Sequence, residues 1–476
     1  MKKKKYIAPS LECLNSVTSD DQALKETAEA YSDKILECLQ TFKVNVAKAG
    51  YEISPINMVF GFTLLPDSSY TTVKNLVKDI SLAVAHEVKL FQRDDKGGVF
   101  SISIQREDRS YVGLREIIDS DEYKNSESSL TIAAGVDELA RSVVFDLGEA
   151  PHLMISGSTG TGKTVYLDDI ILSIVYKSAP SDVKLVLIDP GIDLLAYEGL
   201  PHLLFKPLSR KDEVYEAVKS IKNLMDERYE RLINAHVRDV DSYNEKFKKN
   251  MPRIVLIIDK YLEFTYEMPD DFEDQIKSIA RKGRAAGVHL ILNTQSARSN
   301  RVNGDIKANI PYRIAFSVTD WSESKAILES TGAQKLLGNG DMLLATGFNS
   351  MPRHVQAPSV ELDEIQRVVA DTIEHNGSAK YQFVFDSLRE PIEDDLEYIV
   401  AILQAISASK TIDIDTIKKK LGIEYAEALD VIKFLEDYEL ISKYNGNKKR
   451  NVDIETVDRW LEEFRGELAQ AEENDE

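Results

Sequence analysis

A glycine-rich octapeptide places the strongest constraint on how this chain can fold. Residues 157–164 read GSTGTGKT, a full match to the pattern GxxxxGK[ST]. The run follows an apolar stretch that predicts a strand, residues 153–156, and precedes a helical pattern that begins at Val165. A glycine-rich turn without chemistry is the alternative, although strand, loop and helix stand in the required order. The motif predicts a loop whose backbone N–H groups and following helix N-terminus bind phosphate.

All eight residues of this loop are expected to contact a bound nucleotide. They are Gly157, Ser158, Thr159, Gly160, Thr161, Gly162, Lys163 and Thr164. In such a loop the lysine reaches the β- and γ-phosphates, and the final hydroxyl binds Mg²⁺. We therefore expect ATP and Mg²⁺ as cofactors, with Lys163 as a catalytic residue and Thr164 as a metal ligand.

Two further strand ends are candidates for the same site. Asp259 follows the apolar run 254–258, and it is predicted to be catalytic and to hold Mg²⁺ through water. Gln295, in Asn293-Thr294-Gln295 at the end of another predicted strand, is predicted to orient the attacking water. The alternatives are an acid at an ordinary strand end and an amide satisfied by its own surroundings. The phosphate-binding loop favours the functional interpretation of both residues.

Lys260 stands where ATPases of this type usually place the glutamate that polarises the attacking water. A lysine is cationic at neutral pH and cannot serve as a base unless its pKa is strongly lowered. The sequence therefore leaves two hypotheses open. Either the chain is an active ATPase, or it is an ATP-binding protein whose hydrolysis is impaired by Lys260.

Around the loop, short aliphatic runs alternate with helical patterns. This alternation is typical of a mostly parallel sheet covered on both faces, and it predicts an α/β fold with a RecA-like P-loop NTPase core over residues 136–360. The expected strands are residues 153–156, 184–188, 254–258, 290–293, 313–318 and 341–345.

Five further segments are expected outside this core. Residues 1–50 have a helical pattern, and residues 51–135 mix strand and helix patterns as a small α+β subdomain. Residues 361–390 are expected to be a linker. Residues 391–465 combine three helical patterns with Asn445-Gly446 between two strand-like runs, which is the plan of a winged helix. Residues 466–476 form an acidic tail.

Charge and cysteine content exclude several classes of protein. Acidic residues outnumber basic ones, 80 against 59, and the formal net charge is −21. Any nucleic-acid partner must therefore be held by a local group of basic residues and not by bulk charge. Cys13 and Cys38 offer neither a disulfide framework nor metal-ligand spacing. Because no stretch approaches the roughly 18 apolar residues of a membrane span, we predict a cytoplasmic protein without membrane insertion.

An extended series of short motifs resembles the motor sequence of the FtsK/SpoIIIE family of DNA translocases. The motifs are PHLM at 151–154, LIDP at 187–190, YEGLPHLL at 197–204, ERY at 227–229, YNEK at 243–246, GRAAGVH at 283–289, IKANIP at 306–311, RIAF at 313–316 and LLGNGDM at 336–342. Residues 51–135 resemble the ring-scaffold subdomain of that family, and residues 391–455 resemble its winged-helix subdomain. The resemblance covers nearly the whole chain after about residue 50.

The resemblance implies a homo-oligomeric, hexameric ring with nucleotide between subunits and double-stranded DNA in a central channel. Arg284 would then act as a catalytic arginine finger on a neighbouring subunit, the alternative being a solvated helix face. The expected DNA contacts are Arg298, Arg301, Lys307 and Lys325 in the channel and Lys448, Lys449 and Arg450 in the wing.

The third helix of the expected winged helix departs from a DNA-reading helix. Glu424, Glu427 and Asp430 stand where such a helix presents Arg, Asn or Gln to base edges. Their charge would be repelled by phosphate, so a protein partner is as good an interpretation as nonspecific DNA contact. The alternative to a translocase is thus an ATP-binding scaffold or coupling protein, for example in the transfer of mobile-element DNA.

Overall fold

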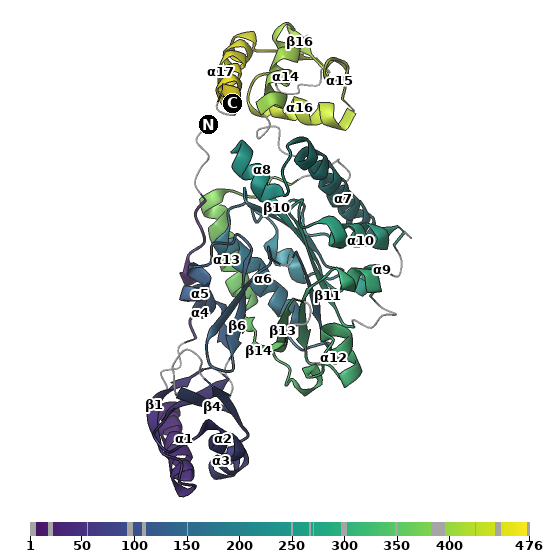
Figure 1. Ribbon diagram of the computed structural model, residues 1–476. Coiled ribbons are helices and arrows are strands. Elements are labelled where there is room, and N and C mark those ends of the chain that lie inside the picture. Colours follow the sequence, from purple (N-terminus) through teal and green to yellow (C-terminus); the bar gives the residue numbers. More distant parts are fainter. Residues whose placement is uncertain are drawn as a thin grey trace. The chain divides into compact units, whose positions relative to one another are not determined.

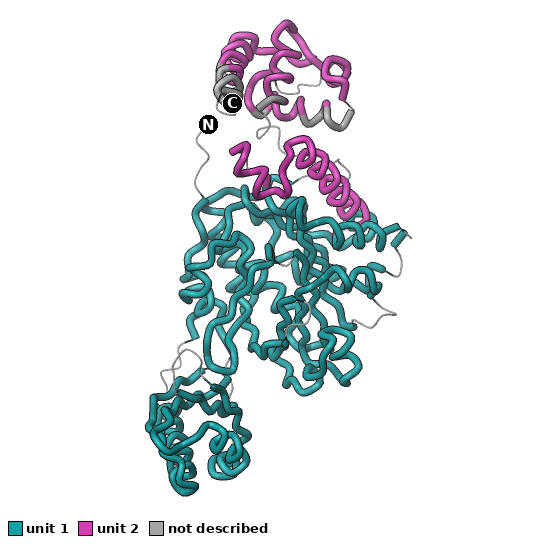
Figure 2. The backbone as a smooth tube through the Cα atoms, viewed as in Figure 1, with its two compact units in different colours: residues 1–214, 252–381 teal, residues 215–251, 382–476 magenta. Residues whose placement is uncertain are grey.

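The computed structural model divides the chain into two compact units (Figure 2). Residues 1–214 and 252–381 form the first unit, and residues 215–251 and 382–476 form the second. The described residues are 6–17, 22–54, 56–92, 99–106, 111–149, 151–248, 251–265, 268–269, 271–296, 302–347, 351–381, 396–423, 425–442 and 449–473.

A nine-stranded sheet organises the first unit, with the strand order β7-β6-β14-β13-β12-β8-β11-β10-β9 (Figure 1). Five neighbouring strands pair in parallel: β12 (Tyr312–Phe316), β8 (His152–Ser156), β11 (Val288–Thr294), β10 (Arg253–Ile258) and β9 (Val183–Ile188). Parallel strands need long crossover connections, and helices supply them here. The predicted α/β fold with a P-loop NTPase core is confirmed.

The other side of this sheet is antiparallel, which the expectation of a mostly parallel sheet did not include. It contains β13 (Asp341–Thr346), β14 (Arg353–Gln356), β6 (Thr131–Asp137) and β7 (Ser142–Asp146). The connection between β13 and β14, residues 347–352, is too short for a parallel crossover. The antiparallel direction of β13 and β14 therefore follows from loop length.

Both faces of the sheet are buried, as the aliphatic character of its strands requires. Leu153 and Ile155 of β8 belong to the main core together with Ile170 of α6 (Lys163–Lys177), and the intervening Met154 is fully buried as well. The other helices of this unit that flank the sheet are α4 (Leu114–Ile118), α5 (Asp121–Lys124), α9 (Tyr261–Thr265), α10 (Phe272–Lys282), α11 (Gly304–Ala308) and α12 (Trp321–Leu328).

The segment expected to be a linker carries a core helix. α13 (Leu362–Asn376) contributes Ile365, Val368 and Val369 to the main hydrophobic core. Its N-terminus is closed by a reciprocal pair of contacts between Glu361 and Glu364. Residues 362–376 are therefore part of the P-loop unit, because their apolar stripe at helical spacing is buried there.

The N-terminal part also divides differently from the expectation. A four-stranded antiparallel sheet, ordered β1-β2-β4-β3, consists of β1 (Val46–Ile53), β2 (Asn57–Leu64), β4 (Val99–Gln105) and β3 (Val88–Gln92). Helices α1 (Gln22–Thr41), α2 (Tyr70–Asn75) and α3 (Val77–Val84) share its core. The boundary expected at residue 50 thus falls inside β1. Residues 6–17 instead contact the larger sheet's helices, where the Tyr6 hydroxyl donates to the Val175 carbonyl at 2.8 Å.

The second unit contains α7 (Lys211–Asn234), most of which belongs here, α8 (Val240–Phe247) and the C-terminal elements. The latter are α14 (Leu396–Ser407), β16 (Thr411–Ile412), α15 (Ile414–Leu421), α16 (Tyr425–Asp437), β17 (Arg450–Asn451) and α17 (Ile454–Glu473). β16 and β17 are antiparallel, and Ile441 pairs with Val452 on either side of the expected hairpin, whose Asn445-Gly446 lies outside the described residues. α17 continues through the boundary expected at residue 465.

None of the helices within the described residues has both the length and the apolar character needed to cross a membrane.

Candidate nucleotide-binding site

The phosphate-binding loop connects β8 to α6, and two of its glycines cannot be replaced without strain. Gly162 has a φ of 107°, and a Cβ there would lie 3.0 Å from the Gly340 backbone nitrogen. A Cβ on Gly157 would lie 2.7 Å from Cβ of Phe316 on β12. The loop therefore passes so close to neighbouring strands and loops that only glycine fits at these two positions.

The Lys163 side chain is folded into this loop. Its Nζ donates to the Ser158 carbonyl oxygen at 2.8 Å, and the Thr161 hydroxyl donates to the same oxygen at 2.7 Å. Burial lowers the pKa of Lys163 to about 8, and the negative charge of Asp259 opposes that shift. A phosphate oxygen would compete with the Ser158 carbonyl for this ammonium group.

Asp259 lies at the carboxyl end of β10 and is fully buried. Its Oδ1 accepts hydrogen bonds from the Lys260 backbone N–H at 2.7 Å and from Asn293 Nδ2 at 2.5 Å. Its Oδ2 has no hydrogen-bond partner among the described residues. Burial raises the pKa of Asp259, and the Lys260 charge opposes that shift. A buried carboxylate oxygen that accepts no hydrogen bond from a described residue, in a cavity that Thr164 also lines, fits a water-mediated contact to Mg²⁺.

One cavity of about 480 Å³ joins these groups. The predicted residues that line it are Thr159, Gly160, Gly162, Lys163, Thr164, Asp259 and Gln295. Residues without a predicted role at the nucleotide also line it, among them Tyr111, Asn339, Gly340, Gln356, Ala357, Pro358 and Ser359, and so does Lys260. The structure thus brings the predicted phosphate, metal and water-orienting residues to one place, and their roles stay predictions.

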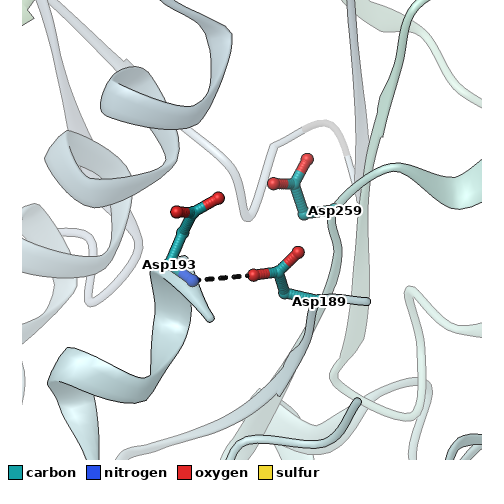
Figure 3. Close-up of side chains that lie close together, drawn as sticks. All are labelled: Asp189, Asp193 and Asp259. Atoms are coloured by element: carbon teal, nitrogen blue, oxygen red, sulfur yellow. Dashed lines mark hydrogen bonds between the residues drawn. The ribbon is translucent and has the colours of Figure 1, made fainter. Parts of the chain in front are cut away.

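The Lys260 side chain does not act as a base, because it lies among three aspartates. Figure 3 shows these aspartates without the lysine. Carboxylate oxygens of Asp189, Asp193 and Asp259 lie within 4.8 Å of one another, a spacing that could hold a metal ion. The positive charge among these carboxylates is instead the Lys260 ammonium group. Its Nζ lies 3.0 Å from Asp189 Oδ1, 3.2 Å from Asp193 Oδ2 and 3.9 Å from Asp259 Oδ2.

Two features hold Lys260 in this cluster as a cation. Its backbone is in the left-handed region, with φ at 49°, which directs the side chain off the line of β10. Burial would lower its pKa, but the hydrogen bonds to Asp189 and Asp193 outweigh burial and raise it. Asp189 was missed in the sequence, although it ends β9 just as Asp259 ends the neighbouring strand.

The residues predicted to act on a neighbouring subunit or on DNA lie outside this cavity. Arg284 follows α10 and is exposed. Lys307 on α11 is partly buried, and burial lowers its pKa. Lys325 on α12 is exposed, with its Nζ 5.6 Å from the centre of the Trp321 ring. The structure does not test whether any of them contacts DNA.

The segment that the sequence predicts to be a basic wing is only partly described. Lys449 is exposed, whereas Arg450 is 8% exposed and its Nε makes an ion pair with Glu436. Much of the Arg450 side chain is thus taken up by its contact with Glu436, and its contact with DNA stays a prediction. Arg298, Arg301 and Lys448 and the acidic side chains of Glu424, Glu427 and Asp430 lie outside the described residues.

Strand, loop and helix, with β11 between the strand that precedes the loop and the strand that ends in Asp259, define a P-loop NTPase core. Residues 113–299 match the FtsK/SpoIIIE family. The chain belongs to the FtsK/SpoIIIE family.

Curated relatives are similar in sequence over most of this chain. The DNA translocase FtsK of Clostridium acetobutylicum is 34% identical over 92% of this chain and 59% of its own length. That of Caldanaerobacter subterraneus is 32% identical over 96% of this chain and 66% of its own length. The chain thus spans about three fifths of the relatives that it matches. A solved structure of the pCW3 conjugation coupling protein TcpA, with ATPgS, covers 72% of this chain at 18% identity and a TM-score of 0.49.

Proposed function

We propose that this chain is an ATP-dependent translocase of double-stranded DNA that acts as a hexameric ring. The observation that carries the proposal is the single cavity that gathers Lys163, Thr164, Asp259 and Gln295 in a chain of this family. The curated relatives named DNA translocase FtsK support the choice of DNA as the partner.

In this proposal each polar group of the cavity has one task. Lys163 leaves the Ser158 carbonyl and binds the β- and γ-phosphates, which offsets their charge in the transition state. Thr164 and Asp259 hold Mg²⁺, which neutralises charge on the phosphate oxygens when bound. Gln295 orients the attacking water, and Arg284 reaches the nucleotide of the next subunit. ATP is thereby hydrolysed between subunits.

DNA would be gripped by few basic side chains inside an acidic ring. The basic residues that we propose to contact DNA are Lys307, Lys325, Arg298, Arg301, Lys448 and Lys449. Each phosphate contact adds close to one unit to the slope of log affinity against log salt. With so few contacts we expect a shallow salt dependence per subunit and a strong dependence on ring assembly.

The test is ATP hydrolysis by the purified chain with and without linear duplex DNA, followed by displacement of a triplex-forming strand. A translocase hydrolyses ATP faster with duplex and displaces the third strand only with ATP. The Lys163→Ala variant is the control for contaminating ATPase activity. Absence of both DNA stimulation and displacement would overturn the proposal.

A second candidate function rests on Lys260, which the three carboxylates hold as a cation next to Asp259. It is an ATP-binding scaffold or coupling protein with impaired hydrolysis. Lys260→Glu alone would add a fourth carboxylate to the cluster, so repulsion would confound the result. The charge-swapped variant Lys260→Glu with Asp193→Lys keeps the same set of charges and restores a glutamate after Asp259.

If Lys260 impairs hydrolysis, the charge-swapped variant turns ATP over faster than the wild type. Asp193→Lys alone is the matched control, because the Asp193 side chain is half exposed. Unchanged or slower turnover in the swapped variant would remove the case for an inhibitory Lys260.

A protein partner at the acidic helix is tested separately, by a pull-down with a variant in which Glu424, Glu427 and Asp430 are neutralised. If this variant retains the same partners as the wild type, a partner at the acidic helix is refuted.

A further inference from the structure

Part of the lining of the nucleotide cavity, which we call its second end, consists of residues that have no place in the phosphate chemistry. Tyr111 and Pro358 present apolar side-chain surface there, and Asn339, Gly340 and Ser359 complete the lining. No charged side chain is among these lining residues of the described chain. Phosphates need N–H groups and cations, so a wall of this composition suits an uncharged planar group instead.

Backbone hydrogen bonds fix this end to the phosphate-binding loop. The Gly340 N–H donates to the Thr161 carbonyl at 3.0 Å, and the Ala357 N–H donates to the Gly340 carbonyl at 2.8 Å. Two segments far apart in sequence are thereby connected to residue 161 of the loop. A ligand that reaches from the loop toward residue 357 is held along one continuous stretch of backbone.

A short parallel pairing brings Tyr111 to the same place. β5 (Val112–Gly113) pairs with β15 (Pro358–Ser359), with Val112 opposite Pro358. Val112 is 2% exposed and anchors the strand, whereas the adjacent Tyr111 is 49% exposed although its ring is large and largely apolar. A half-exposed tyrosine on the wall of a cavity, beside a buried anchor, has a ring face available for a ligand.

We propose that Tyr111 stacks on the base of the nucleoside triphosphate bound in the cavity that the phosphate-binding loop also lines. This inference rests on the proposed function and names the part of the site that holds the base. Stacking on an aromatic ring is tolerant of base identity because every base has a π face. The subsite therefore takes adenine and guanine nucleotides with similar affinity.

The experiment compares three probes on the full chain by calorimetry: AMP-PNP, GMP-PNP and inorganic tripolyphosphate, all with Mg²⁺. Tripolyphosphate has no base, so it reports the phosphate end alone. Tyr111→Ala should weaken both nucleotides about 10-fold and leave tripolyphosphate within about 2-fold. Tyr111→Phe should bind all three like the wild type. Phe42→Ala is the matched control, since Phe42 is an aromatic residue with 47% exposure on the smaller sheet domain.

Each outcome decides one of the two proposals. If Tyr111→Ala binds the nucleotides like the wild type, or weakens tripolyphosphate equally, the base-stacking role is wrong and the proposed function stands. If the wild type binds tripolyphosphate and the nucleotides equally tightly, the base adds nothing and the subsite is again overturned. If the wild type binds none of the probes, the proposed function itself fails.

Discussion

The two ends of the nucleotide cavity are built in opposite ways. At the phosphate end, Lys163 and Asp259 are buried, charged and fixed by hydrogen bonds to their immediate neighbours. At the base end, Tyr111 is half exposed and immediately precedes the two-residue strand β5. Buried charges act only when their geometry is fixed, whereas stacking needs only a ring face at the right place. We therefore expect large effects from changes at the first end and modest ones at the second.

Lys163→Ala should give the largest effect and tests this contrast directly. Loss of a charged hydrogen-bond donor to two phosphates should cost about 3 kcal/mol or more, or at least about 100-fold in affinity. AMP-PNP and tripolyphosphate should weaken to the same extent, because both depend on the phosphate end. Calorimetry with Mg²⁺ measures both. A variant that lost AMP-PNP binding but kept tripolyphosphate binding would break the contrast between the two ends.

Asp259→Asn should separate chemistry from binding within the phosphate end. The asparagine Oδ1 can still accept from Asn293. The charged Oδ2, which accepts no hydrogen bond from a described residue, is replaced by a neutral amide nitrogen. ATP turnover should fall about 100-fold, while Mg²⁺-free ADP binding changes less than about 3-fold. Steady-state hydrolysis and calorimetry in EDTA provide the two readouts. Equal losses in both would mean that Asp259 supports the loop and does not hold the metal.

The residues of the phosphate end could be predicted because short stretches of sequence identify them. Residues 157–164 are consecutive, and Asp259 and Gln295 each stand at the end of a predicted strand, so parallel pairing had to bring them to one edge. The base end could not be found in this way. Tyr111 reaches the cavity only through the pairing of β5 with β15, and the burial of residues 362–376 depends on the same tertiary packing.

Charge placement was equally hidden from the sequence. Lys260 was recognised as unusual, but its three partners come from two strand ends and a short helix, η2 (Asp193–Tyr197). Arg450 was counted as a DNA contact on charge alone, yet it is buried against Glu436. A sequence gives the sign of a charge, and only the packing shows whether that charge meets solvent or a partner.

Lys260→Met should show that the aspartate cluster next to the phosphate end depends on its internal cation. Three carboxylates would lose their shared ammonium, and the two buried ones would remain uncompensated, which should destabilise the P-loop unit by about 2 kcal/mol. Thermal melting without nucleotide measures this, and addition of millimolar Mg²⁺ should restore part of the loss. The Tyr111→Ala variant, at the other end, should melt within about 1 °C of the wild type. Equal melting of wild type and Lys260→Met would show that the cluster needs no cation.

The smallest expected effect concerns Asp168, on α6 behind the phosphate end, whose Oδ1 accepts from the Tyr197 hydroxyl at 2.9 Å. Burial raises the pKa of Asp168 to about 7, and Asp193, Asp259 and Asp189 add to the shift. Because the unfolded pKa is near 4, the folded state holds its proton more tightly. Stability from this group is therefore present below about pH 4 and is lost as the pH rises to about 7.

Asp168→Asn keeps the acceptor for Tyr197 and removes the titration, so it should raise the melting temperature at pH 8 by a few degrees and change it little at pH 5. This corresponds to about 1 kcal/mol. Melting curves at the two pH values measure the difference, with Asp33→Asn as control, because the Asp33 side chain is 72% exposed. Parallel shifts of the variant at both pH values would mean that Asp168 is ionised throughout. The phosphate end would then tolerate one more negative charge than the proximity of Asp189, Asp193 and Asp259 implies.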